Sequence, residues 1–272
     1  MTRLLKDKYF IIALLTFLGF TVVWLYIFLT GANTHTLITS IFGATYGLMA
    51  LVGAIFGILI SRKYGSFKSA LGRAILAFSF GLLAQEFGQV VYTYYLYGAG
   101  IEIPYPSYGD IGYFGSVLLY IYGALQLSKA AGVRLVLGSY KKKSVAVIVP
   151  ALLLGFAYWL FLANYDYSNI QPLTVLLDFG YPLGQAVYIS IALVTILLSR
   201  GMLGGIMKSK VEMVLVALTA QFIADYTFLF QTKIGTWAAG GINDYMYLVA
   251  YFLMTVALIR MKLVFDKVKE AK

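Results

Sequence analysis

Acidic side chains stand in the middle of long apolar stretches of this 272-residue sequence, where a charge is costly. Glu86, Asp178 and Asp225 each lie inside such a stretch, and no lysine or arginine lies at the same depth to pair with them. A carboxylate at the centre of a bilayer costs roughly 2.5–3.5 kcal/mol on insertion scales. We therefore expect the three to face one another, tyrosine hydroxyls, glutamine amides or water, as a ligand, ion or proton site. The alternative is an interhelical hydrogen-bond network with a purely structural role.

Helical spacing groups Asp178 with two further polar residues. Asp178, Tyr181 and Gln185 follow at steps of three and four, which places them on one stripe of a helix. Pro182 in that stripe frees a backbone carbonyl and predicts a kink.

The other two acids also have glutamine neighbours at helical spacing. Gln221 and Asp225 are four apart, and Glu86 and Gln89 are three apart. The predicted ligand- or ion-binding residues are Glu86, Gln89, Asp178, Tyr181, Gln185, Gln221 and Asp225.

The pattern Asp-x-x-Tyr occurs twice, each time where an apolar stretch begins after a polar loop. The simplest interpretation of each aspartate is an N-cap that satisfies free N–H groups at a helix start. The first loop, 98–109, holds two prolines and three glycines, and it predicts a rigid, non-helical lid. The predicted residues at the outer mouth of the site are Asp110, Tyr113, Asp244 and Tyr247.

The residue inventory excludes most cofactor chemistry. The chain has no cysteine and one histidine, which excludes disulfides, iron–sulfur clusters, bis-histidine haem and a Ser-His-Asp triad. No lysine lies at mid-membrane depth, which excludes a retinal Schiff base. We predict neither a metal nor a cofactor.

Eight apolar stretches must position these residues. The chain is 61% hydrophobic and 12% charged, against about 25% charged in a soluble domain. Each stretch has about the 20 residues that a helix needs to cross a bilayer. The predicted fold class is an all-α integral membrane protein whose eight transmembrane helices lie at about 9–30, 37–61, 71–97, 110–131, 144–164, 170–199, 210–232 and 243–263.

The basic residues gather on one side of these spans. Twenty of the 21 lysines and arginines fall in the termini and alternate connections, and only Lys233 does not. This bias predicts cytoplasmic N and C termini in a multi-pass protein of the cell membrane. The net charge of +10 is then a topology signal, and no basic-aromatic groove for nucleic acid accompanies it. The predicted partner is the lipid bilayer.

The two halves of the chain resemble each other. Residues 1–135 and 136–272 each hold four spans, so we predict two parallel four-helix repeats related by a pseudo-twofold axis along the membrane normal. A central cavity between the halves would follow, although two bundles side by side would also fit. Offsets of 134–137 residues relate Trp24 to Trp159, Gly43 to Gly180, Gln85 to Gln221, and Asp110 to Asp244.

Two pairs of glycines lie on the apolar stretches. Gly43 with Gly47, and Gly112 with Gly115, are typical of small residues that let helices approach closely. We expect a packing role for them rather than a binding role.

Two stretches are similar to a known class of membrane domain. Residues 104–113 resemble the Pro-Ser-x-x-Asp-x-x-Tyr signature of multi-span membrane input modules from prokaryotic diguanylate cyclases and histidine kinases. Residues 178–185 resemble their Asp-x-x-Tyr-Pro-Leu-Gly-Asp segment, with Gln185 in place of the last aspartate. The resemblance implies a sensory or ligand-binding membrane domain. We expect no kinase or cyclase domain after Lys272, so that a signal would pass to a separate protein.

Four functions remain open from the sequence. The first is binding or sensing of a small molecule or cation that enters from the outer side. The second is a secondary transporter that uses the acids as a proton or cation relay. The third is an intramembrane enzyme that acts on a lipid or isoprenoid, although we favour a protein without enzymatic activity. The fourth is a structural subunit of a membrane complex.

Overall fold

The computed structural model describes residues 3–31, 36–132, 140–165, 171–199 and 208–270. His35 and the predicted boundary between residues 135 and 136 lie outside these ranges. Within them every regular element is a helix, and eight stretches are long and apolar enough to cross a membrane. The elements are α1 (Lys8–Thr30), α2 (Leu37–Thr45), α3 (Leu48–Lys63), η1 (Ser66–Lys68), α4 (Ala70–Thr93), η2 (Tyr94–Ala99), α5 (Gly109–Ala130), α6 (Tyr140–Ala157), η4 (Tyr158–Leu162), α7 (Pro172–Ser199), α8 (Lys208–Lys233) and α9 (Ile242–Glu270).

The predicted all-α fold with eight helical stretches long and apolar enough to cross a membrane is therefore confirmed, with one interruption. The second span is not one helix, because it divides at Tyr46 and Gly47 into α2 and α3. In an unbroken helix the Gly43 carbonyl would accept the Gly47 amide. Here it accepts Gln89 Nε2 of α4 at 2.6 Å. A side chain inserted into the hydrogen-bond ladder is a recognised cause of a helix break.

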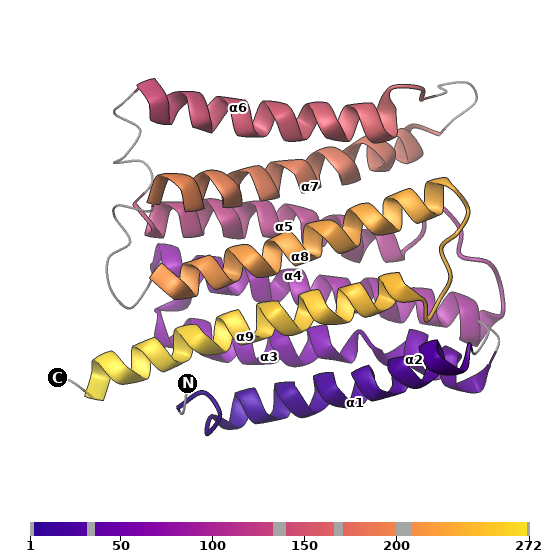
Figure 1. Ribbon diagram of the computed structural model, residues 1–272, viewed down its shortest axis with the longest axis horizontal. Coiled ribbons are helices and arrows are strands. Elements are labelled where there is room, and N and C mark those ends of the chain that lie inside the picture. The colour runs from indigo at the N-terminus through magenta and orange to yellow at the C-terminus, as the bar shows by residue number, and fades with distance from the viewer. Residues whose placement is uncertain (1–2, 32–35, 133–139, 166–170, 200–207, 271–272) are drawn as a thin grey trace.

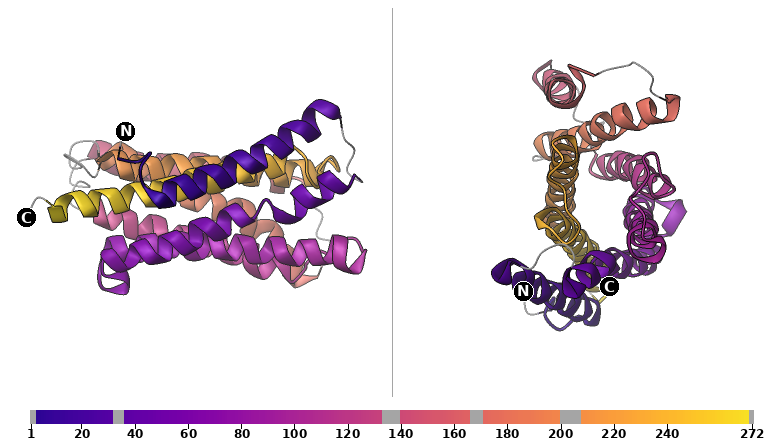
Figure 2. Two further views of the ribbon diagram at one scale, coloured as in Figure 1. Left: turned by 90° about the horizontal axis from the view of Figure 1, so that it is seen from below. Right: turned by 90° about the vertical axis from the view of Figure 1, so that its right-hand side faces the viewer.

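Six of the helical segments form a closed ring. In sequence around it, α3 packs on α4, α4 on α5, α5 on α7, α7 on α8, α8 on α9, and α9 returns to α3. The ring is visible when the bundle is seen end-on (right panel of Figure 2). Helix α1 packs outside the ring against α9, and α6 packs outside it against α7 (Figure 1).

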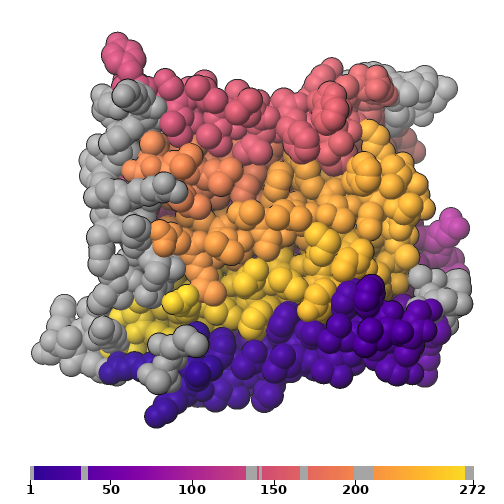
Figure 3. Space-filling view, in the orientation of Figure 1, coloured from indigo at the N-terminus to yellow at the C-terminus, as the bar shows by residue number. Residues whose placement is uncertain are grey.

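The two outer helices present apolar side chains away from the ring. Val22 on α1 and Leu152 on α6 are exposed, and so is Trp159, just beyond α6. A space-filling view shows the face to which α1, α9, α8 and α6 contribute (Figure 3). Exposed apolar surface of this extent is unfavourable in contact with water and favourable in contact with lipid chains. The outer surface thus agrees with the hydropathy of the spans.

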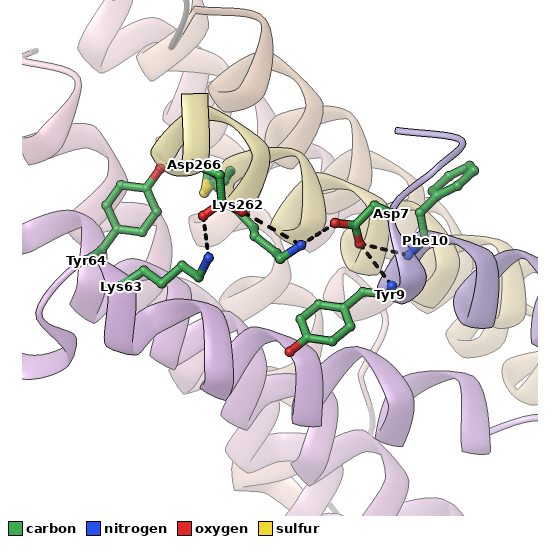
Figure 4. A network of polar contacts seen from close by, with 8 residues as sticks. Asp7, Tyr9, Phe10, Lys63, Tyr64, Lys262 and Asp266 are labelled. Carbon is green, nitrogen blue, oxygen red and sulfur yellow. Dashed lines mark hydrogen bonds and ion pairs between the residues drawn. The ribbon is translucent and has the colours of Figure 1, made fainter. Parts of the chain in front are cut away.

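Both described chain ends lie at one end of the bundle, together with η1, and we call this the near end (Figure 1). Ion pairs tie α1, α3 and α9 together there (Figure 4). Lys262 pairs with Asp7, which also caps α1 by accepting the Tyr9 amide at 2.9 Å. Lys63 pairs with Asp266, one turn along α9 from Lys262. The opposite end of the bundle, which we call the far end, carries the segments 100–108 and 234–241 (right-hand side of Figure 1).

Candidate functional site

A cavity of about 660 Å³ lies inside the ring, in the half of the bundle nearest the far end. Side chains of α4, α5, α7, α8 and α9 line it, together with Tyr46 at the α2–α3 break. Ile103, Pro104 and Tyr105 of the segment 100–108 also line it, as the lid prediction expects. The non-helical part of that segment is shorter than predicted, because η2 continues to Ala99 and α5 begins at Gly109.

Two aspartates share the corner of the cavity where α5 meets α7. Asp110 accepts the Tyr181 hydroxyl at 2.7 Å and the Ser107 amide at 2.7 Å. Asp178, three residues before Tyr181 on α7, accepts the Tyr105 hydroxyl at 2.6 Å and the Tyr165 hydroxyl at 2.5 Å. The connection after η4 and the segment 100–108 therefore converge on Asp178.

Two further aspartates line the cavity from α8 and α9. Asp225 accepts the Gln221 side-chain amide and the Tyr188 hydroxyl, each at 2.9 Å, and Tyr247 of α9 is a neighbour of its carboxylate. Asp244, one turn before Tyr247 on α9, accepts the Gly240 amide at 2.6 Å. All the donors found at these two carboxylates are neutral groups.

Tyr46 connects the break in the second span to both halves of the ring. Its hydroxyl has two acceptor neighbours, Gln89 Oε1 at 3.0 Å and the carboxylate of Asp244. Tyr113 of α5 also donates to Gln89 Oε1, at 3.0 Å. The Gln89 side chain therefore has three hydrogen-bond partners, because its amide nitrogen also donates to the Gly43 carbonyl oxygen.

The described lining residues include four carboxylates and one basic side chain. The basic residue is Lys233, whose ammonium group donates to the backbone oxygen of Leu160 at 2.7 Å. Acidic groups therefore outnumber basic groups in the cavity lining, and the carboxyl groups are stabilised by hydroxyl and amide donors rather than by ion pairs. Across the described residues, no three His, Cys, Asp or Glu side chains converge closely enough to hold a metal ion.

Nine of the eleven predicted residues line this one cavity, and two do not. Gln221 stands behind the wall and reaches Asp225. Glu86, which we expected beside Asp178 and Asp225, is absent from the described lining and packs toward the α2–α3 break. A Cβ atom on Gly47 would lie 2.2 Å from Glu86 Oε2. The residues that line the cavity are Gln89, Asp110, Tyr113, Asp178, Tyr181, Gln185, Asp225, Asp244 and Tyr247.

The geometry of α4 explains the placement of Glu86. Successive residues of a helix are rotated by about 100°, so Gln85 and Gln89 share a direction that Glu86 does not. Both glutamines line the cavity. Gln85 donates to Ser116 Oγ at 2.8 Å and accepts the Tyr251 hydroxyl at 3.0 Å.

The N-cap interpretation of the two Asp-x-x-Tyr aspartates is wrong. Asp110 is the second residue of α5 and Asp244 the third of α9. Each carboxylate reaches back to an amide before its own helix, at Ser107 and at Gly240. Ser107 Oγ in turn accepts the Gly109 amide at 3.1 Å, so the first helix start has the reciprocal form of a capping box.

Sequence reasoning missed three tyrosines of the site, Tyr46, Tyr105 and Tyr165. A signal for the first was present, since Tyr46-Gly47-Leu48 matches Tyr181-Pro182-Leu183 at an offset of 135 residues. The other two lie in connections, where no helical spacing relates them to Asp178. Their role depends on how those connections fold over the ring.

No protein-family model, curated protein or solved structure matches this chain.

Proposed function

We propose that this membrane protein binds a small organic cation in the cavity, as a receptor or sensor. The observation that carries the proposal is the unequal charge of the lining, four carboxylates against one lysine among the described residues. A cation that enters would gain charge–charge attraction where little water competes. The volume of the cavity, about 660 Å³, falls within the range of about 300–1,000 Å³ that small-molecule sites occupy.

Aromatic rings make the cavity better suited to an organic cation than to a bare ion. Tyr92, Tyr113, Phe228, Trp237 and Tyr247 are among its lining residues. Ring faces attract cations and also cover the apolar part of a ligand. The four carboxylates come from four different helices, so they suit a ligand with some length.

We propose that the halves 1–135 and 136–272 are parallel repeats, and two pairs of contacts support this. Helix α3 packs on α9, and α5 packs on α7, which are equivalent seams if α3 corresponds to α7 and α5 to α9. At one seam Tyr181 donates to Asp110, and at the other Tyr46 approaches Asp244. These four residues are related by offsets of 135 and 134.

The same proposal gives the protein an orientation. The basic segments favour a cytoplasmic near end in the cell membrane, so that the cavity opens toward the outside. The stretches that resemble sensor input modules, 104–113 and 178–185, both contribute side chains to the cavity. Ligand binding would then bias contacts at the near end, where a separate signalling or membrane-complex partner would read them.

Calorimetric titration of the purified protein in detergent tests the proposal. We expect binding of benzylamine, which is a cation at neutral pH, and at least about tenfold weaker binding of benzyl alcohol, its neutral counterpart. The double variant Asp178→Asn/Asp225→Asn should lose at least about tenfold in benzylamine affinity. The control Glu102→Gln/Glu212→Gln removes the same charge away from the cavity and should bind normally. Equal binding of the two compounds, or an unaffected double variant, would refute the proposal.

A secondary transporter is the second candidate, and one observation favours it. The second span is broken next to the cavity at Gly47, and at the matching position of the sixth span Pro182 stands inside the continuous helix α7, where it removes one backbone hydrogen bond. Glycine or proline residues that weaken helices at matching positions of two repeats are typical of transporter binding sites. Proteoliposomes loaded with radiolabelled benzylamine distinguish the candidates: flux that depends on a proton gradient and is abolished by Asp225→Asn indicates transport, whereas binding without flux indicates a receptor.

A further inference from the structure

Resting on the proposed function, we infer that the ligand is a linear amine with two positive charges, one held at each of two acidic corners of the cavity. The α5–α7 corner is defined by Asp110 and Asp178. The α8–α9 corner is defined by Asp225 and Asp244. Chains with a primary ammonium group at each end, such as diaminoalkanes and short polyamines, have this chemistry.

The first corner brings two carboxylates together across a helix seam. Tyr181 lies one turn from Asp178 on α7 and donates to Asp110 on α5, so one hydrogen bond joins the two helices that carry these acids. Asp178 receives its two hydroxyl donors from Tyr105 and Tyr165. A carboxylate has about four acceptor positions, so both acids keep capacity for a ligand N–H.

The second corner takes its two carboxylates from the neighbouring pair of helices. Tyr247 lies one turn from Asp244 on α9 and its side chain is a neighbour of Asp225 on α8. Asp225 and Asp244 are both buried, with 4% and 3% of their surface exposed. Carboxylates on two different sides of the cavity, α5 with α7 and α8 with α9, suit two separate ammonium groups better than one.

Charge balance favours the same conclusion. Four carboxylates and one lysine among the described lining residues leave a formal charge of −4 + 1 = −3. A single ammonium group could contact one corner and would leave the other uncompensated. A dication would place one positive charge at each corner, and the aromatic and aliphatic wall between them would cover its methylene chain.

An amide oxygen adds a preference for ammonium groups that carry hydrogen. Gln185 is 3% exposed, lines the cavity two turns beyond Asp178 on α7, and its Oε1 has no hydrogen-bond partner. Buried polar atoms without a partner are uncommon and costly. An ammonium group with N–H bonds could serve both the carboxylate and this oxygen, and a trimethylammonium group could serve neither by hydrogen bonding.

Matched ligand series on the unaltered protein test the inference. Titration of α,ω-diaminoalkanes with four to ten carbons should show an optimum length at which the diamine binds at least about tenfold more tightly than the n-alkylamine of equal length. Bis-trimethylammonium compounds of the optimum length should bind at least about tenfold less well than the diamine.

Single charge removals then assign the two corners. Asp178→Asn and Asp225→Asn should each reduce the advantage of the diamine to less than about threefold, while the monoamine still binds at the intact corner. Monoamines that bind as tightly as diamines at every length would overturn the inference and leave the proposed cation site standing. A protein that binds neither series would overturn both. Equal binding of the bis-trimethylammonium compounds would remove the role of Gln185.

Discussion

The crossing of α4 and α5 allows a sharp prediction, because two glycines on α5 have opposite surroundings. A Cβ atom on Gly112 would lie 2.3 Å from the backbone oxygen of Ala84 and 2.8 Å from the backbone nitrogen of Gly88, both on α4. A Cβ atom on Gly115 would meet nothing within 4 Å. The predicted packing role therefore holds for Gly112 and not for Gly115.

The comparison of Gly112→Ala with Gly115→Ala isolates this contact. Both changes raise helix propensity by about 1 kcal/mol, and that gain cancels in the comparison. Normal contact with the Ala84 oxygen requires the helices to separate by about 1 Å, and such overpacking costs typically about 1–3 kcal/mol. We expect Gly112→Ala to be the less stable variant by that amount.

Thermal unfolding of both variants in the same detergent measures the difference, and benzylamine titration reports its effect on the site. Displacement of α5 moves Asp110 and Tyr113 at the cavity wall, so Gly112→Ala should also weaken binding, whereas Gly115→Ala should not. Equal stability of the two variants, or a less stable Gly115→Ala, would refute the packing of α4 on α5 described above.

Two predictions concern the near end. Lys262→Met should destabilise the protein by about 3–5 kcal/mol, because it leaves the Asp7 side chain, 6% exposed, without its cation. Lys63→Met should cost no more than about 1 kcal/mol, since that lysine and Asp266 are 34% and 33% exposed; chemical denaturation that ranks the two variants the other way would contradict this. Burial, with the nearby charge of Asp266, raises the pKa of Tyr64 to about 12. Folding favours the neutral phenol, so the stability that this pKa shift contributes is present below pH 10 and is lost between about pH 10 and 12. Over that range the Tyr64→Phe variant should lose less stability than the parent protein. Identical loss of stability at alkaline pH in the two proteins would contradict this prediction.

Much of the fold follows from the apolar stretches, because length and hydropathy alone locate a membrane helix. The division of the second span does not follow from them. It depends on the amide of Gln89, which belongs to another helix and takes the carbonyl of Gly43. Sequence periodicity within residues 37–61 carries no information about that contact.

The candidate site was predictable where helical spacing applies. Asp178, Tyr181 and Gln185 line the cavity as one stripe because α7 runs through Pro182 without a break. Glu86 shows where spacing fails, since a rotation of about 100° from Gln85 turns it toward α2 and α3. Glu86 lies three residues before Gln89, which is compatible with one broad face of the helix. Only the position of the neighbouring helices decides which part of that face points into the cavity.

The most direct test of the account is a structure of the protein with 4-bromobenzylamine bound, because anomalous scattering from bromine locates the ligand independently of the protein density. We predict a bromine peak inside the ring, with the ammonium group within hydrogen-bond distance of the carboxylate of Asp110, Asp178, Asp225 or Asp244. A bromine peak confined to the outer surface of α1 or α6, with the cavity unoccupied at saturating ligand, would contradict it.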